Sequence, residues 1–176
     1  NSRWIVIHVA AAITGSSVLC LAAVFSILYL VKDRVERRQR PPAPPLVAGA
    51  AQTADRVEVD RAVARHGGIW DRLPSADTLD QLAYRTTAFG FPIWTFAIIA
   101  GAIWAQAAWG RYWGWDPKET WSFISWTVFA AYLHARATAG WRGRRAAWLA
   151  IIGLATLLFN FYAVNTVIVG LHSYGG

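Results

Sequence analysis

The sequence has no methionine, a single cysteine (Cys20), and little charge for its 176 residues. Because it starts at Asn1 and contains no initiator, we expect the chain to be part of a longer protein. One cysteine excludes a disulfide framework and a C-x-x-C pair. Charged residues are only 15% of the chain and hydrophobic residues are 56%. A soluble domain carries more charge, so this composition indicates a membrane protein.

Four long segments are apolar around their whole circumference, which is typical of helices surrounded by lipid. At ~1.5 Å of rise per residue such segments can cross a hydrocarbon core of ~30 Å. The sequence therefore predicts an all-α integral membrane protein with four transmembrane helices, at residues 4–31, 86–108, 120–135 and 146–171. The connecting loops are predicted at 32–85, 109–119 and 136–145.

The basic residues are distributed unequally between the two ends of these segments. Fourteen of the 17 lysines and arginines fall in the loops 32–85 and 136–145, which predicts that both loops are cytoplasmic. Both termini of the chain and the loop 109–119 would then be extracytoplasmic. The net charge of +7 is explained by this topology. A nucleic-acid partner is not expected, because eight acidic residues share the 32–85 loop with the arginines.

The predicted outer loop and the turn that follows it contain four tryptophans within thirteen residues, namely Trp109, Trp113, Trp115 and Trp121. An aromatic belt at the lipid headgroups accounts for one or two of them. A flat, apolar, aromatic ligand accounts for the rest, because indole rings offer large faces and Gly110 and Gly114 allow close backbone approach. Arg111 and Lys118 have the charge to pair with two carboxylates at the edge of such a ligand.

The acidic residues of this loop have a structural interpretation that we prefer to a catalytic one. Asp116 is placed to cap the next helix, with Pro117 at the first helical position and Glu119 as the returning partner of a capping box.

The segment WGRYWGWDPKETWSFISW resembles the WWD motif of the haem-handling protein superfamily. Its WDPKETW form is most similar to the cytochrome c synthesis branch, of the CcsA or ResC type, and the similarity extends over all four predicted spans. The resemblance implies a bacterial plasma-membrane protein that binds haem b as a substrate, with a ResB-type membrane partner subunit and apocytochrome c as partners. The chain has no C-x-x-C-H segment, so it is not itself a c-type cytochrome.

His8 and His172 are both predicted near the outer ends of their spans, beside the tryptophan-rich loop. Imidazoles are the expected ligands of a low-spin haem iron. The alternative is that each is an interfacial histidine bonded to a neighbouring helix. The resemblance implies that these two positions are the external metal ligands of haem held under the WWD loop.

His134 lies about 25 Å along the third predicted span from that loop, so it cannot share an iron with His8 and His172. It either satisfies carbonyls at the end of a helix or, as the resemblance implies, is a metal ligand of a second, inner haem. We interpret His66 as a solvated loop residue. Asn160 and Asn165 are expected to bond neighbouring helices.

The resulting hypothesis is that haem is moved outward, held under the tryptophans and presented for thioether attachment to apocytochrome c. The chain would then be a subunit of a holocytochrome c synthase complex, with no residue acting as a dedicated general base. Two alternatives remain: a haem exporter or chaperone that makes no bond, and a structural or quinone-binding subunit of a membrane electron-transfer complex.

Overall fold

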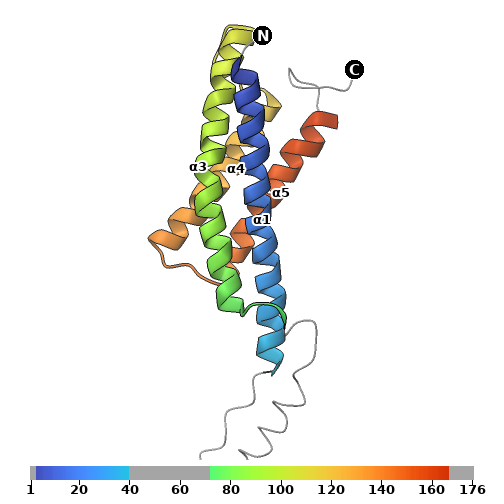
Figure 1. Ribbon diagram of the computed structural model, residues 1–176, viewed down its shortest axis with the longest axis vertical. Coiled ribbons are helices and arrows are strands. Elements are labelled where there is room, and N and C mark those ends of the chain that lie inside the picture. The colour runs from blue at the N-terminus through green and yellow to red at the C-terminus, as the bar shows by residue number, and fades with distance from the viewer. Residues whose placement is uncertain (1–2, 40–71, 167–176) are drawn as a thin grey trace, which may run out of the picture.

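A computed structural model describes residues 3–39 and 72–166 of the chain. Within these residues all regular structure is helical. The helices are α1 (Arg3–Gln39), α3 (Ala76–Trp109), α4 (Pro117–Ala137) and α5 (Arg144–Thr166). They alternate in direction along the bundle, so that the start of α1, the end of α3 and the beginning of α4 lie at the same end (Figure 1).

Three of the four helices are long and apolar enough to cross a membrane: α1, α3 and the Arg144–Tyr162 part of α5. The prediction of an all-α membrane protein agrees with this composition. The helix α4 has 21 residues but is not among the three. A crossing at 120–135 therefore stays a prediction.

The helices extend further than the apolar segments from which they were predicted. The helix α1 continues to Gln39, and α3 begins at Ala76, so the connection between them is shorter than the predicted loop 32–85. Local bonds explain both extensions. The Nε of Arg37 donates to both carboxylate oxygens of Asp33 at 2.9 Å, one helical turn away. The Ser75 hydroxyl accepts from the Thr78 backbone N–H at 3.3 Å and caps α3.

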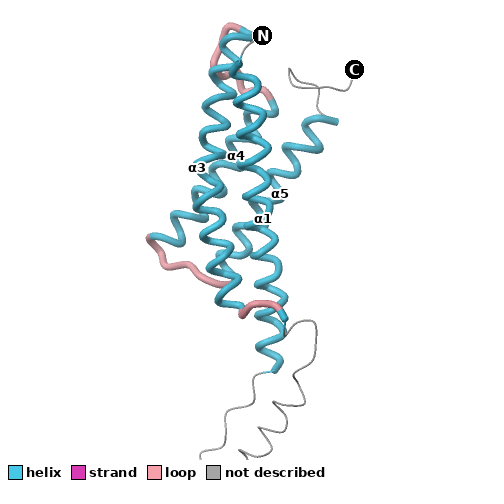
Figure 2. The backbone as a smooth tube through the Cα atoms, in the orientation of Figure 1, coloured by secondary structure: helices cyan, strands magenta, loops and turns pink. Residues whose placement is uncertain are grey.

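The antiparallel pair α1 and α3 runs side by side along the bundle (Figure 2). Small residues allow this close approach. A Cβ on Gly15 would lie 2.9 Å from the backbone nitrogen of Trp94, and one on Gly90 would lie 2.8 Å from the side chain of Val18. Glycine at helix contacts is a common means of packing in membranes, because backbone-to-backbone approach increases van der Waals attraction.

The second antiparallel pair, α4 and α5, packs against the first through a shared core. Buried side chains from all four helices form this core: Leu19, Trp94, Ala97, Phe129 and Leu157. Side-chain hydrogen bonds also join α4 to its neighbours α3 and α5. The Trp126 indole N–H donates to the Thr95 hydroxyl at 2.9 Å, and the Asn160 amide donates to the Ser122 hydroxyl at 2.9 Å. The second bond confirms the expected role of Asn160.

At the end of the bundle away from the tryptophan-rich loop, one buried carboxylate joins three segments. Asp80 of α3 accepts from Arg136 Nη1 of α4 at 2.6 Å and from the Gly143 backbone N–H at 3.0 Å. The Arg136 side chain is only 6% exposed, and its guanidinium also lies 4.8 Å above the ring of Tyr84. This cluster fixes the turn between α4 and α5 against α3.

Candidate functional site

The tryptophan-rich connection begins where a glycine stops α3. Gly110 adopts the left-handed conformation with φ of 72°, and its N–H donates to the Gln106 carbonyl at 3.0 Å. This C-cap turns the chain sharply, so that the next six residues cross directly from α3 to α4. Gly110 thus allows the reversal that places the motif at the end of the bundle.

The start of α4 is capped in the way that the sequence predicts. The Asp116 side chain accepts from the Lys118 backbone N–H at 3.3 Å, Pro117 is the first helical residue, and Glu119 completes the capping box. The Glu119 carboxylate accepts from two backbone N–H groups, those of Gly114 at 2.7 Å and Asp116 at 3.2 Å. One carboxylate therefore fixes the second half of the loop onto α4.

The four indoles of the motif contact different neighbours. Trp113 and Trp115 meet edge to face at 5.8 Å between ring centroids, and Trp115 meets Phe123 in the same way at 6.3 Å. Trp109 contacts Trp104 edge to face at 4.9 Å. Trp121 lies 4.1 Å from Phe159 of α5. The motif thus makes aromatic contacts with α3 through Trp104, with α4 through Phe123 and with α5 through Phe159.

Trp115 combines two unusual properties. It is the only non-glycine residue with positive φ in the described part of the chain, at 55°. It is also 66% exposed. A bulky residue rarely adopts this conformation, and such strain concentrates at sites where a side chain must be presented in one direction. The surrounding bonds from Glu119 hold the loop in this form.

His8 of α1 is brought to the motif through a chain of rings. Its imidazole stacks on Trp104, with 6.4 Å between centroids and 5° between planes, and Trp104 contacts Trp109. His8 Nδ1 lies 2.8 Å from the carbonyl oxygen of Ala97 on α3. A carbonyl only accepts, so Nδ1 carries the proton and the lone pair is on Nε2. A histidine that ligates a metal is commonly oriented by such a bond from its other nitrogen.

The space for this imidazole depends on Gly101. A Cβ at that position would lie 2.7 Å from both Cε1 and Nδ1 of His8. Any other residue at 101 would therefore displace the ring or break its bond to Ala97. Reasoning from the sequence missed Gly101, Ala97 and Trp104, although the Gly-x-x-Trp spacing on one helix face was visible.

The two basic residues of the loop lie in different environments. Arg111 is exposed, and its guanidinium donates to the Gly114 carbonyl at 3.4 Å. Lys118 is half-buried in the first turn of α4. Burial lowers the pKa of the Lys118 ammonium, and the neighbouring Asp116 carboxylate opposes that shift. A partly desolvated ammonium interacts more strongly with an anion than one in bulk water.

The other histidines are not at this end in the described part of the chain. His134 is exposed in the last turn of α4, and its carbonyl accepts from the backbone and hydroxyl of Thr138 at 2.9 and 2.7 Å. It lies at the opposite end of α4 from Asp116. His172 and His66 lie outside the described residues, as does the side chain of Asn165. The structure therefore brings His8, but not His134, to the tryptophans.

Comparison with known proteins places this arrangement in a family. Residues 1–172 match the family model described as "Cytochrome C assembly protein". The chain is 39% identical to the cytochrome c biogenesis protein CcsA of Gloeobacter violaceus, 39% to that of Prochlorococcus marinus and 41% to that of Guillardia theta. Each similarity covers 99% of the chain but only 59%, 55% and 55% of the respective relative.

Proposed function

The chain belongs to the cytochrome c assembly protein family, and from this membership we propose that it holds haem at its tryptophan-rich end for attachment to apocytochrome c. The observation that carries the proposal is the setting of His8. Its Nδ1–H bond to Ala97, 2.8 Å long, orients the imidazole and leaves the lone pair on Nε2, and its ring stacks on Trp104 next to the motif. This is the tautomer that an iron ligand requires.

The remaining residues of the site have complementary roles in this proposal. His172 is the second axial ligand, from the segment that follows α5. Trp109, Trp113, Trp115 and Trp121 provide apolar faces for the macrocycle, and Arg111 and Lys118 pair with its carboxylates. Asp116 and Glu119 act indirectly by holding the loop in shape. Two imidazoles at the axial positions would exclude oxygen from the iron.

The proposed topology follows from the distribution of basic residues between the loops and from the packing of α4 against its neighbours. The apolar stretch 120–135 crosses the membrane as the third of four spans, because α4 packs against both α3 and α5, which are each long enough to cross it. The tryptophan-rich end is extracytoplasmic in the bacterial plasma membrane. His134, about 25 Å away along α4, ligates haem on its way from the cytoplasmic side.

The chemistry is supplied mainly by the substrates. Apocytochrome c offers the two thiols of a C-x-x-C-H segment, which add to the haem vinyl groups to give two thioethers. The contribution of this chain is to orient haem and exclude water, so that the reactants meet at near-attack distance. The chain spans less than two thirds of the length of its relatives, so the remaining part of the protein is also needed. The complete protein, together with a ResB-type partner, would form the synthase.

Absorption spectra of the purified full-length complex test the outer site. His8→Ala and His172→Ala should each lose the low-spin haem spectrum, and added imidazole should restore it by filling the empty ligand position. His66→Ala, in the segment between α1 and α3, is the matched control and should leave the spectrum unchanged. Unchanged spectra in both variants would refute the assignment of His8 and His172.

A second measurement separates synthesis from transport. The purified complex is incubated with reduced haem and a C-x-x-C-H peptide, and the thioether product is detected by mass spectrometry. Product formation supports the synthase role, whereas bound haem without product supports an exporter or chaperone. A complex with no Soret band would instead support a structural subunit of an electron-transfer complex.

A further inference from the structure

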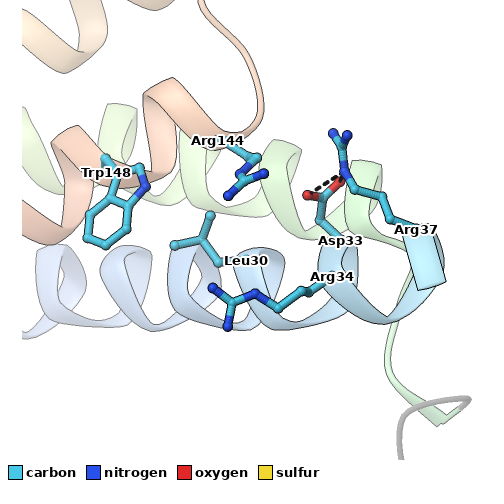
Figure 3. A pocket seen from close by; sticks show the side chains of 6 residues that line it. All are labelled: Leu30, Asp33, Arg34, Arg37, Arg144 and Trp148. Carbon is cyan, nitrogen blue, oxygen red and sulfur yellow. Dashed lines mark hydrogen bonds and ion pairs between the residues drawn. The ribbon is translucent and has the colours of Figure 1, made fainter.

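A small basic pocket lies between the end of α1 and the start of α5, at the opposite end of the bundle from the tryptophan-rich loop 109–119. It has a volume of about 70 Å³ and is lined by Leu30, Asp33, Arg34, Arg37, Arg144 and Trp148. Figure 3 shows the guanidinium groups of Arg34 and Arg144 on either side of Leu30, with Arg37 turned toward Asp33. The proposed function assigns no role to these residues.

The pocket has more positive charge than its own acid can neutralise. Three arginines line it with one carboxylate, and that carboxylate is bonded to Arg37 Nε through both oxygens at 2.9 Å. Among the described residues, Arg34 and Arg144 make no hydrogen bond or ion pair. The helix α5 also begins with Arg144 and Arg145 and has no acidic residue in its first turn. Cations at a helix N-terminus are unfavourable, because they repel the positive end of the helix dipole. A bound anion would remove this repulsion.

The position of the pocket along α1 and α5 indicates the depth in the membrane at which such an anion would bind. The apolar part of α1 ends at Val31, directly before the charged run that starts at Lys32, and the apolar part of α5 starts at Ala146, directly after Arg145. Both helices therefore change from apolar to basic at the level of the pocket. Trp148 beside it is 55% exposed. Exposed tryptophans and arginines at such a boundary are typical of the depth of lipid headgroups.

We propose that this pocket binds the phosphate of an anionic phospholipid, with Arg34 and Arg144 as its ligands. Guanidinium groups bind phosphate oxygens in a planar, two-bond geometry that suits this role. The apolar surfaces of Leu30 and Trp148 lie where the glycerol and the first acyl carbons would extend into the membrane. A zwitterionic lipid fits less well, because its own ammonium would be placed against three arginines.

Native mass spectrometry of the full-length protein, equilibrated with phosphatidylglycerol and phosphatidylcholine of the same acyl chains, tests the proposal. Each basic residue near a membrane surface contributes about 1 kcal/mol to the binding of anionic lipid, or about fivefold. R34Q/R144Q should therefore lower the preference for phosphatidylglycerol by about 25-fold. R38Q/R145Q is the matched control. It removes the same charge from two likewise exposed arginines that do not line the pocket. These act on the lipid only through long-range, salt-screened charge, so the loss of preference should be clearly smaller than in R34Q/R144Q.

The outcomes distinguish a defined pocket from a general charge effect. Equal losses in both double variants, or no loss in R34Q/R144Q, would overturn the proposal. Displacement of phosphatidylglycerol by inorganic phosphate at equal concentration would show a free-anion site instead. E58Q/D60N removes acids from the chain's own segment between α1 and α3. If the wild type shows no preference and this variant gains one, the pocket belongs to that acidic segment and the proposal fails.

Discussion

The substitution Gly101→Ala isolates the positioning of His8 from its chemistry. The imidazole itself is retained, but the added Cβ would lie 2.7 Å from its Cε1 and Nδ1, closer than such atoms approach in proteins. The ring must therefore rotate or move away from α3, and its 2.8 Å bond to the Ala97 carbonyl is lost. Overpacking of this kind costs about 1–3 kcal/mol, and loss of a bond that orients a metal ligand weakens metal binding about 10–100-fold.

We expect Gly101→Ala to lower haem affinity by about 10–100-fold in the full-length protein. The assay is haem transfer to apomyoglobin, followed in the Soret region, with added imidazole as a rescue. Gly153→Ala is the matched control, because a Cβ there would lie 2.7 Å from the ring of Phe129, in the core and away from His8. It crowds the bundle to a similar extent, so it should leave haem transfer near that of the wild type.

Two results would refute this reasoning. Wild-type haem affinity in Gly101→Ala would show that the position of His8 is not critical. Equal losses in Gly101→Ala and Gly153→Ala would show that general crowding, and not the imidazole, controls haem binding.

Two further predictions concern stability. Asp80→Asn leaves Arg136 buried without its counter-ion, so it should lower the free energy of unfolding in detergent by about 3–5 kcal/mol. The control Asp77→Asn, in the first turn of the same helix, should lower it by less than ~1 kcal/mol. Asp116→Ala removes the cap of α4, so it should lower the free energy of unfolding by about 0.5–2 kcal/mol and speed amide hydrogen exchange at Lys118. The control Thr127→Ala, further along α4, should leave that exchange unchanged.

Local features of the fold were predictable from the sequence. The cap at Asp116 has a signature within four residues, and the structure confirms it. The apolar segments indicated where the helices lie but not where they end. A run of charged residues ends an apolar segment, yet Asp33 and Arg37 continue α1 because they pair across one turn. Helix ends are set by backbone bonds rather than by hydropathy alone.

Long-range features were not predictable in the same way. The bond between Asp80 and Arg136 joins residues 56 positions apart, and nothing in either local segment indicates it. Trp104 and Gly101 were missed for a related reason. Their importance depends on a histidine 93 or more positions earlier in the chain, on a different helix. By contrast, the sequence did predict that His8 lies at the same end of the bundle as the tryptophan-rich loop. This prediction needed only the order of the apolar segments, because successive helices alternate in direction.

The junction at Asp80 has a mechanical consequence. It clamps α3, α4 and the following turn together at one end of the bundle, while at the other end α5 leans away from α1 (Figure 1). Because α5 follows this turn directly, the buried ion pair also fixes the point from which α5 departs from the rest of the bundle.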